Sequence, residues 1–226
     1  MIRFVEHSQQ GDRPVACEPA ALVIAGWTGR DPVAVEHHIR ELEAMGIPRP
    51  AQMPMYYRVA TSTLTTAPTI QVVGTGGSGE AEYVLVAGSE RLWVGVGSDH
   101  TDRKLERQSV ALSKQVCQKP MAPALWPLDE VADHWDALSL TSHAWIGGER
   151  VLYQQGTVSA LRAPSDLMGA YTGNGELPAD TVMFCGTLPV RVDIEFADRF
   201  EFELADPVLR RSLRHAYDIF ALPLVG

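Results

Sequence analysis

The sequence predicts an α+β protein that is predominantly β, with a few helices. Most apolar segments are short runs rich in β-branched and aromatic residues, broken by glycines, and this pattern is typical of strands. Few segments have the apolar spacing that indicates a helix. With 226 residues, of which 46% are hydrophobic and 21% charged, the chain is long enough to bury a sizeable core, and we expect a single domain over residues 1–226.

Residues 1–60 are expected to hold an N-terminal strand, a helix and a lid-like loop. The apolar run at 21–27 has the length of a strand. The clearest helix lies at 31–46, where Asp31 can cap the first turn and a glycine can end the last. The proline-broken segment 47–60 predicts an extended loop over the surface.

Residues 61–205 are expected to form the β core, and residues 206–226 a closing helix centred on 206–220. Two helical pieces interrupt the core, at 128–138 and 163–173. Seven runs in the core have the composition of strands: 69–74, 81–88, 91–97, 138–148, 150–156, 181–190 and 199–206.

The charge and the cysteines exclude several settings. A net charge of −9 argues against nucleic acid or an anionic membrane surface as a partner. The sequence contains no signal-peptide core and no run of 18 apolar residues. Its three cysteines are scattered without CxxC spacing, which is typical of reduced thiols. We therefore expect a cytoplasmic protein without nucleic-acid or membrane partners.

The glycine-rich stretch at 72–88 raises the question of a phosphate-binding loop. Gly74 and Gly79 have the spacing of such a loop, but Glu80 stands where a lysine is required. A strand-like run follows instead of a helix, so no helix N-terminus is available for a phosphate. This hypothesis is rejected.

The two glutamates in this stretch predict a metal site instead. Residues two apart on a strand point to the same face, so Glu80 and Glu82 would lie side by side, roughly 7 Å apart along the backbone. Carboxylates that close repel each other unless a cation lies between them, and Mg²⁺ and Mn²⁺ prefer carboxylate oxygens. The alternative is a solvent-facing strand edge with two unrelated acids.

A third carboxylate follows the next strand-like run. The polar turn within 92–106 carries Asp99, His100 and Asp102, and an oxygen ligand delivered there would complete one face of the coordination shell. His100 is an alternative ligand in place of Asp99 or beside it, although imidazole suits a softer metal. A hydrogen-bonded loop without a metal is the third interpretation.

Six segments, in the same order across residues 31–205, resemble the catalytic domain of the fumarylacetoacetate hydrolase superfamily. They are EHHIRE, PRPAQMPMYYRVATSTL, SGEAEYVLVAG, GSDHTDRKLE, LSKQVCQKP and APSDLMGAY…ELPADTVMFCGTLPV. The chain is similar to a divergent bacterial branch of that superfamily. The resemblance implies a mixed β-sandwich or β-roll with peripheral helices, a Mg²⁺ or Mn²⁺ ion, and a homodimer. It also implies a substrate among the 2-oxo and 1,3-dicarbonyl carboxylates.

The resemblance assigns roles to individual residues. Glu80, Glu82 and Asp99 fall on metal-ligand positions, and Lys114 on that of an active-site lysine. Substrate-binding positions are filled by Tyr57, Arg58, Arg103, Glu106 and Thr187. Three carboxylates and one divalent ion carry a charge of −1, so an anionic substrate needs further cationic groups, for which Lys114 and Arg103 are the candidates.

The catalytic dyad implied by the resemblance is His38 with Glu41. The two residues are three apart on a predicted helix and therefore share a face. Glu41 would orient the imidazole, and His38 would take a proton from water. His37 is the alternative base.

Departures from the family pattern lie mainly around the substrate. Ser98 replaces an asparagine before Asp99, Glu106 replaces a glutamine that usually binds substrate, Lys104 replaces an acid, and Ala179 replaces a glycine. These changes leave the metal triad intact and leave the substrate undefined.

Three functions are consistent with the sequence. The first is a divalent-metal-dependent hydrolase that cleaves a C–C bond in an acylpyruvate-like 2-oxo or 1,3-dicarbonyl carboxylic acid. The second is a lyase or isomerase on the same scaffold, such as a 2-oxo acid decarboxylase, a tautomerase or a hydratase, which needs the metal but no activated water. The third is a non-catalytic β domain that binds a small molecule.

Overall fold

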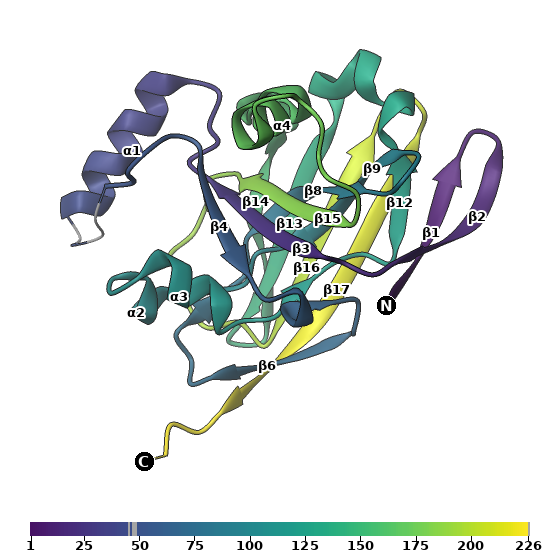
Figure 1. The fold of residues 1–226 in the computed structure, drawn as a ribbon. Coiled ribbons are helices and arrows are strands. Elements are labelled where there is room, and N and C mark those ends of the chain that lie inside the picture. Colours follow the sequence, from purple (N-terminus) through teal and green to yellow (C-terminus); the bar gives the residue numbers. More distant parts are fainter. Residues whose placement is uncertain (45, 47–48, 226) are drawn as a thin grey trace.

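Two β-sheets pack face to face in the computed structural model, with short helices around them (Figure 1). The structure describes residues 1–44, 46 and 49–225, and for His38 and Leu42 it describes the backbone alone. No helix in this described part is both long and apolar enough to cross a membrane. The three cysteines are buried and form no disulfide.

The secondary structure consists mainly of strands. The larger sheet contains β1 (Ile2–Ser8), β2 (Gly11–Cys17), β3 (Ala21–Gly26), β4 (Met55–Val59), β8 (Ala81–Ala87), β9 (Leu92–Ser98), β12 (Ala124–Pro127) and β15 (Thr181–Thr187). The smaller sheet contains β6 (Thr69–Val73), β13 (Ser139–Ile146), β14 (Glu149–Thr157), β16 (Arg199–Asp206) and β17 (Arg211–Leu222). Four two-residue strands are β5 (Leu64–Thr65), β7 (Gly77–Ser78), β10 (Thr101–Asp102) and β11 (Lys119–Pro120).

The helices are short and peripheral. They are α1 (Pro32–Ala44), α2 (Arg103–Glu106), α3 (Val110–Gln115) and α4 (Pro164–Thr172). Short 3-10 segments occur at η1 (Thr61–Thr63), η2 (Leu128–Glu130), η3 (Ala132–Ala137) and η4 (Val158–Ala160). The predicted α+β, predominantly β class is therefore confirmed.

The strand order places β8 and β9 in the middle of the larger sheet. That order is β2-β1-β12-β9-β8-β15-β3-β4, and the order of the smaller sheet is β14-β13-β16-β17-β6. Along β8, Tyr83 and Leu85 enter the apolar cluster that spans the two sheets, whereas Val84 and Val86 belong to a second cluster. Because side chains alternate between the faces of a strand, β8 is covered on both faces. Its seven residues are all buried.

The helices predicted at 31–46 and 163–173 are confirmed as α1 and α4. The Asp31 carboxylate accepts a hydrogen bond from the backbone N–H of Val33 at 2.9 Å, which caps the first turn of α1. Gly46, with φ of 87°, follows the last turn, in the left-handed region that favours glycine. Residues 45 and 47–48 of the predicted helix and loop lie outside the described part of the chain.

The closing helix predicted over 206–226 is wrong, because this segment forms a hairpin. β16 ends at Asp206, a turn follows, and β17 returns antiparallel to β16 while pairing with β6 on its other side. Leu213 and Tyr217 are both buried. Their spacing of four residues suits one face of a helix and one face of a strand equally, so pairing with two neighbouring strands decides the conformation.

Two further expectations are corrected in part. Residues 128–138 form the two 3-10 segments η2 and η3 instead of one α-helix, and His134 has non-helical dihedral angles (φ −126°, ψ 27°). The segment 47–60 was predicted as a surface loop, but its described part contains the strand β4, which pairs with β3 at the edge of the sheet. The hairpin of β1 and β2 was not predicted.

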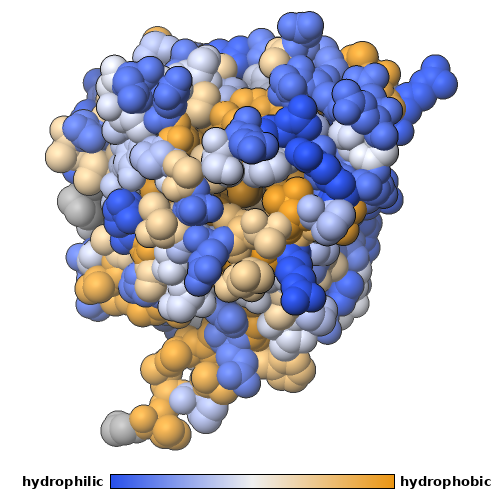
Figure 2. Space-filling view, turned by 45° about the vertical axis from the view of Figure 1, so that its right-hand side comes forward, coloured by the Kyte–Doolittle hydropathy of each residue, from blue (hydrophilic) through white to orange (hydrophobic). Residues whose placement is uncertain are grey.

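An apolar segment beyond β17 projects from the body of the molecule, as Figure 2 shows at its lower end. Leu224 is 75% exposed and Val225 is 86% exposed. Phe220, on the last part of β17, is 60% exposed. The surface near β6 and the end of β17 is therefore unusually apolar.

Candidate metal centre

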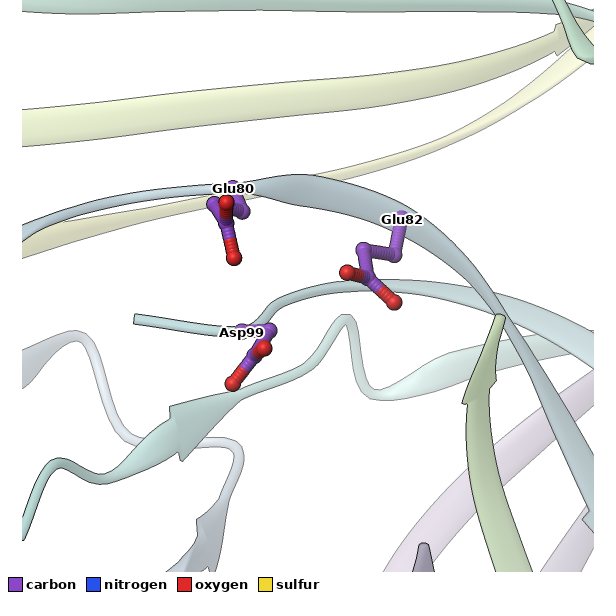
Figure 3. A group of neighbouring side chains, drawn as sticks. All are labelled: Glu80, Glu82 and Asp99. Atoms are coloured by element: carbon purple, nitrogen blue, oxygen red, sulfur yellow. The ribbon is translucent and has the colours of Figure 1, made fainter. Parts of the chain in front are cut away.

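Three carboxylates converge where the start of β8 meets the end of β9 (Figure 3). Glu80 directly precedes β8, Glu82 lies on it, and Asp99 directly follows β9. β8 and β9 are antiparallel neighbours with Ala81 opposite Ser98, so these three positions fall together. One oxygen from each carboxylate lies within 4.8 Å of the other two.

Backbone hydrogen bonds hold this arrangement. The N–H of Asp99 donates to the carbonyl oxygen of Glu80 at 2.9 Å. The N–H of Gly186, on the neighbouring strand β15, donates to Glu82 Oε2 at 2.7 Å. Gly186 has φ of 100°, and a Cβ atom there would lie 1.6 Å from Thr28 Oγ1. Only glycine can place its amide at this point.

Three cationic side chains surround the carboxylates. Lys114, from α3, contacts Asp99 Oδ2, and its Nζ is 3.5 Å from Glu80 Oε2. Lys119, from β11, places its Nζ 2.9 Å from Asp99 Oδ1. Arg103, from α2, places Nη2 2.9 Å from Glu80 Oε1. The cluster is therefore a network of alternating charges around Asp99 and Glu80.

Burial and charge shift the pKa values of this network in opposite directions. Burial would raise the pKa of Asp99, but the ammonium groups of Lys114 and Lys119 outweigh it and lower the pKa to about 2. Burial raises the pKa of Glu82 well above its usual value, and the charges of Asp99 and Glu80 raise it further. Burial opposes the charge on Lys114, but the three carboxylates raise its pKa overall. Asp99 is therefore held in its charged form.

The donor set fits a hard divalent cation. All three candidate ligands are carboxylate oxygens, the type that Mg²⁺ and Ca²⁺ prefer, and three protein ligands leave room for water and substrate. His100 is not part of this group. It is fully buried, its Nδ1 lies 2.9 Å from the Tyr217 hydroxyl, and burial lowers its pKa to about 3, aided by the charges of Lys119 and Arg103.

Three predicted substrate residues lie against this centre. Arg103 Nη1 is 3.1 Å from Glu106 Oε2, so the guanidinium bridges Glu80 and Glu106. Thr187 lies opposite Glu82 on β15. Its hydroxyl donates to the carbonyl oxygen of Ala81 at 2.8 Å. The Thr187 hydroxyl therefore has no hydrogen left to donate to a substrate, which limits the part it can play in binding one.

The other predicted substrate residues lie farther along the sheet. Tyr57 and Arg58 are on β4, which is separated from β8 by β15 and β3. The Tyr57 hydroxyl is 3.4 Å from Trp27 Nε1, and Arg58 Nη1 is 3.4 Å from the Tyr171 hydroxyl. The structure therefore places both residues against aromatic side chains, with two strands between them and the carboxylates on β8.

The predicted dyad lies on α1, at the periphery of the molecule (Figure 1). The side chain of His38 is outside the described part of the structure. Glu41 is exposed, and its Oε1 lies 3.4 Å from Nδ1 of His37 one turn earlier. Proton transfer by His38 and Glu41 stays a prediction.

Sequence reasoning missed three residues that shape the centre: Lys119, Gly186 and Gln154. Gln154, buried on β14, donates from Nε2 to the Thr187 hydroxyl at 2.6 Å and accepts from the Ala81 N–H at 3.0 Å. One feature of the sequence points to Lys119: the chain contains only three lysines, and two of them, Lys114 and Lys119, lie five residues apart. Gly186 lies in a segment that carries the family resemblance, but the contacts of Gly186 and Gln154 could not be predicted, since their partners are distant in sequence.

The fold is that of the fumarylacetoacetate hydrolase family. A yeast protein of that family, ynq8, matches with a TM-score of 0.65 and 14% identity, over 90% of this chain and 94% of that one. The predicted resemblance is thereby confirmed at the level of the fold. The sequence itself belongs to the family described as "Protein of unknown function (DUF2848)", whose model matches residues 25–217. None of the curated protein sequences matches the chain.

Two other solved structures with this fold contain metal ions. One is 2-keto-3-deoxy-D-arabinonate dehydratase complexed with magnesium and 2,5-dioxopentanoate, with a TM-score of 0.63 and 16% identity over 94% of this chain and 77% of that one. The other is 4-oxalocrotonate decarboxylase from Pseudomonas putida G7 complexed with calcium and acetate, with a TM-score of 0.58 and 15% identity over 88% and 76%.

Proposed function

We propose that this protein is a divalent-metal-dependent enzyme that acts on a small 2-oxo or 1,3-dicarbonyl carboxylic acid. The observation that carries the proposal is the group of three carboxylates, drawn from two adjacent strands and enclosed by three cationic side chains. Surface acids do not need buried counter-charges, so a non-catalytic acidic patch is the weaker explanation. The metal ions and the carboxylate ligands of proteins with the same fold, 2,5-dioxopentanoate and acetate, support the same class of chemistry.

Glu80, Glu82 and Asp99 would hold Mg²⁺ or Mn²⁺. A divalent ion bound there supplies Lewis-acid polarisation of a carbonyl group. Lys114 and Arg103 provide the positive charge that an incoming carboxylate requires, and the side chain of Arg103 is 19% exposed at the edge of the centre. A planar guanidinium can bind a carboxylate with two hydrogen bonds.

Among the possible reactions we propose C–C bond hydrolysis of an acylpyruvate-like acid, with His38 as the base that activates water and Glu41 as its orienting partner. The second candidate is a lyase or isomerase reaction. One observation favours it: two proteins with this fold are a dehydratase and a decarboxylase.

Turnover assays with Mg²⁺ separate these candidates. Acylpyruvate cleavage would be followed beside decarboxylation of a 2-oxo dicarboxylic acid, using wild type, Asp99→Asn and His38→Ala. The proposal expects Asp99→Asn to lose either activity, and expects His38→Ala to abolish hydrolysis while sparing a lyase reaction. Turnover that Asp99→Asn retains in full would refute the metal-dependent mechanism.

A further inference from the structure

Lys119 is a buried charge that the proposed reaction does not use. Its side chain is fully buried on β11. Its Nζ lies 2.9 Å from Asp99 Oδ1 and donates to the carbonyl oxygen of His100 at 2.7 Å. It is thus closed off from any substrate, unlike Arg103 at the edge of the centre.

A lysine in this position is energetically unusual. Removing an ammonium group from water costs several kcal/mol unless a charged partner compensates. The partner, Asp99, already contacts Lys114 through its other oxygen, so one carboxylate faces two ammonium groups. One ammonium group is enough to neutralise the charge of Asp99. The positive charge of the second therefore acts on the other carboxylates of the cluster as well.

We propose that Lys119 is a fixed counter-cation of the metal centre, which holds the carboxylates together before an ion binds and opposes the ion once it is bound. This inference rests on the proposed metal site. Three carboxylates within 4.8 Å of one another repel, and a resident cation offsets that repulsion. The same charge lies beside a ligand oxygen and therefore lowers the affinity for a divalent ion, because like charges repel strongly in a buried site.

The net charge of the centre with a divalent ion bound, here called the loaded centre, follows from the same residues. Glu80, Glu82, Asp99 and Glu106 carry four negative charges, and Lys114, Lys119 and Arg103 carry three positive charges. A divalent ion brings the total to +1, which attracts an anionic ligand. Without Lys119 the loaded centre is neutral. Lys119 therefore lowers affinity for the cation and raises affinity for the anion.

Loss of Lys119 leaves the geometry of Asp99 anchored by other contacts. The N–H of Asp99 donates to the Glu80 carbonyl oxygen at 2.9 Å, and its own carbonyl oxygen accepts from Thr101 Oγ1 at 2.9 Å. Lys114 still contacts Oδ2. Removing the Lys119 charge is therefore expected to change the affinity for the ion more than any accompanying change in the orientation of Asp99 does.

The test is calorimetric titration of Lys119→Met beside wild type and Lys104→Met, a matched control at the one exposed lysine. Mg²⁺ is titrated into chelator-stripped protein, and oxalate is then titrated at one fixed, saturating Mg²⁺ concentration. We expect Lys119→Met to bind Mg²⁺ about tenfold more tightly and oxalate about tenfold more weakly, since each effect removes one nearby charge. Its metal-free form is expected to melt at a lower temperature, and Lys104→Met to match wild type throughout.

Opposite changes in the two affinities distinguish an electrostatic role from a structural one, because a damaged site would bind both ligands more weakly. Unchanged or weaker Mg²⁺ binding by Lys119→Met would overturn the inference and leave the proposed function standing. Absence of Mg²⁺ binding by wild type would overturn both. If Lys119→Met does not fold, Lys119→Gln, which keeps a hydrogen-bond donor without the charge, takes its place in the same comparison.

Discussion

Glu82 is oriented by a backbone amide from a neighbouring strand. The N–H of Gly186 donates to Glu82 Oε2 at 2.7 Å, and the space beside this amide is filled by Thr28. A glycine with φ of 100° thus fixes a carboxylate of the candidate metal centre. At the residue scale, the centre depends on where the backbone of β15 bends.

Gly186→Ala is expected to lower the free energy of unfolding by about 2 kcal/mol or more, because the new Cβ collides with Thr28 and the backbone angle disfavours alanine. Because the displaced amide no longer orients Glu82, Mg²⁺ affinity should fall as well. Urea denaturation and calorimetry measure the two effects.

Gly169→Ala is the matched control, since Gly169 lies in α4 with open space around its Cα. Alanine in a helix interior should stabilise the protein by about 0.5 kcal/mol. Equal stability of the two variants would contradict the role given to Gly186.

The three candidate metal ligands and their partners show what a sequence can predict at this scale. Glu80 and Glu82 were predicted because a spacing of two on a strand is visible in the chain, and Asp99 because it follows the next run. Lys119 and Gly186 act through partners 20 and 104 residues away from them, at Asp99 and Glu82. Such pairings depend on strand order, which the local sequence does not encode.

At the scale of elements, the hairpin of β16 and β17 shows why one prediction failed. The turn between them is built on Asp206, whose Oδ1 accepts from the N–H groups of Val208 and Leu209 at 3.0 Å. An aspartate that accepts from the following amides can begin a turn or cap a helix, so the sequence supported either. Pairing with β6, which lies far away in sequence, favours the strand.

Asp206 makes this hairpin sensitive to acid. Burial opposes its charge, but the amide of Leu209 and the side chain of His134 lower its pKa below the usual value. Arg211 also contacts it, with Nε 3.3 Å from Oδ2. A carboxyl whose pKa is lowered by folding stabilises the protein above its unfolded pKa of about 3.9, and that contribution is lost as the pH falls through the folded value.

Asp206→Asn is therefore expected to lower the free energy of unfolding by about 2 kcal/mol near pH 7, the scale of hydrogen bonds to a charged group. Near pH 3 the decrease should be much smaller. Urea denaturation at both pH values provides the measurement. Asp133→Asn, at an exposed position of η3, should change stability at neither pH. If Asp206→Asn lowers the free energy of unfolding as much near pH 3 as near pH 7, the stabilising role of the charged Asp206 carboxylate is contradicted.

At the scale of the whole molecule, the centre arises where the middle strands of the larger sheet meet short segments that follow them. β9, β8 and β15 are adjacent in the sheet, and they bring together residues from 80 to 187 in sequence. The class of fold was predictable from composition and motif order. The two-residue strands β7 and β11, which carry Ser78 and Lys119, have no periodicity that a sequence pattern can reveal.

We expect the protein to be a homodimer, as the family resemblance implies. Phe220, Leu224 and Val225 are exposed beside one edge of the smaller sheet, and an apolar surface of this kind is stabilised by contact with another protein. Light scattering coupled to size exclusion should give twice the 24.7 kDa of one chain. A mass equal to one chain at micromolar concentration would contradict the expectation.

The metal centre is the central claim, and direct titration tests it. Mg²⁺ and Mn²⁺ would be titrated into chelator-stripped wild type and into the double variant Glu80→Gln/Glu82→Gln, whose fold is checked by circular dichroism. We expect saturable binding at one site in wild type and none in the variant. Absence of binding in wild type, or binding that the variant retains in full, would contradict the assignment of Glu80, Glu82 and Asp99 as metal ligands.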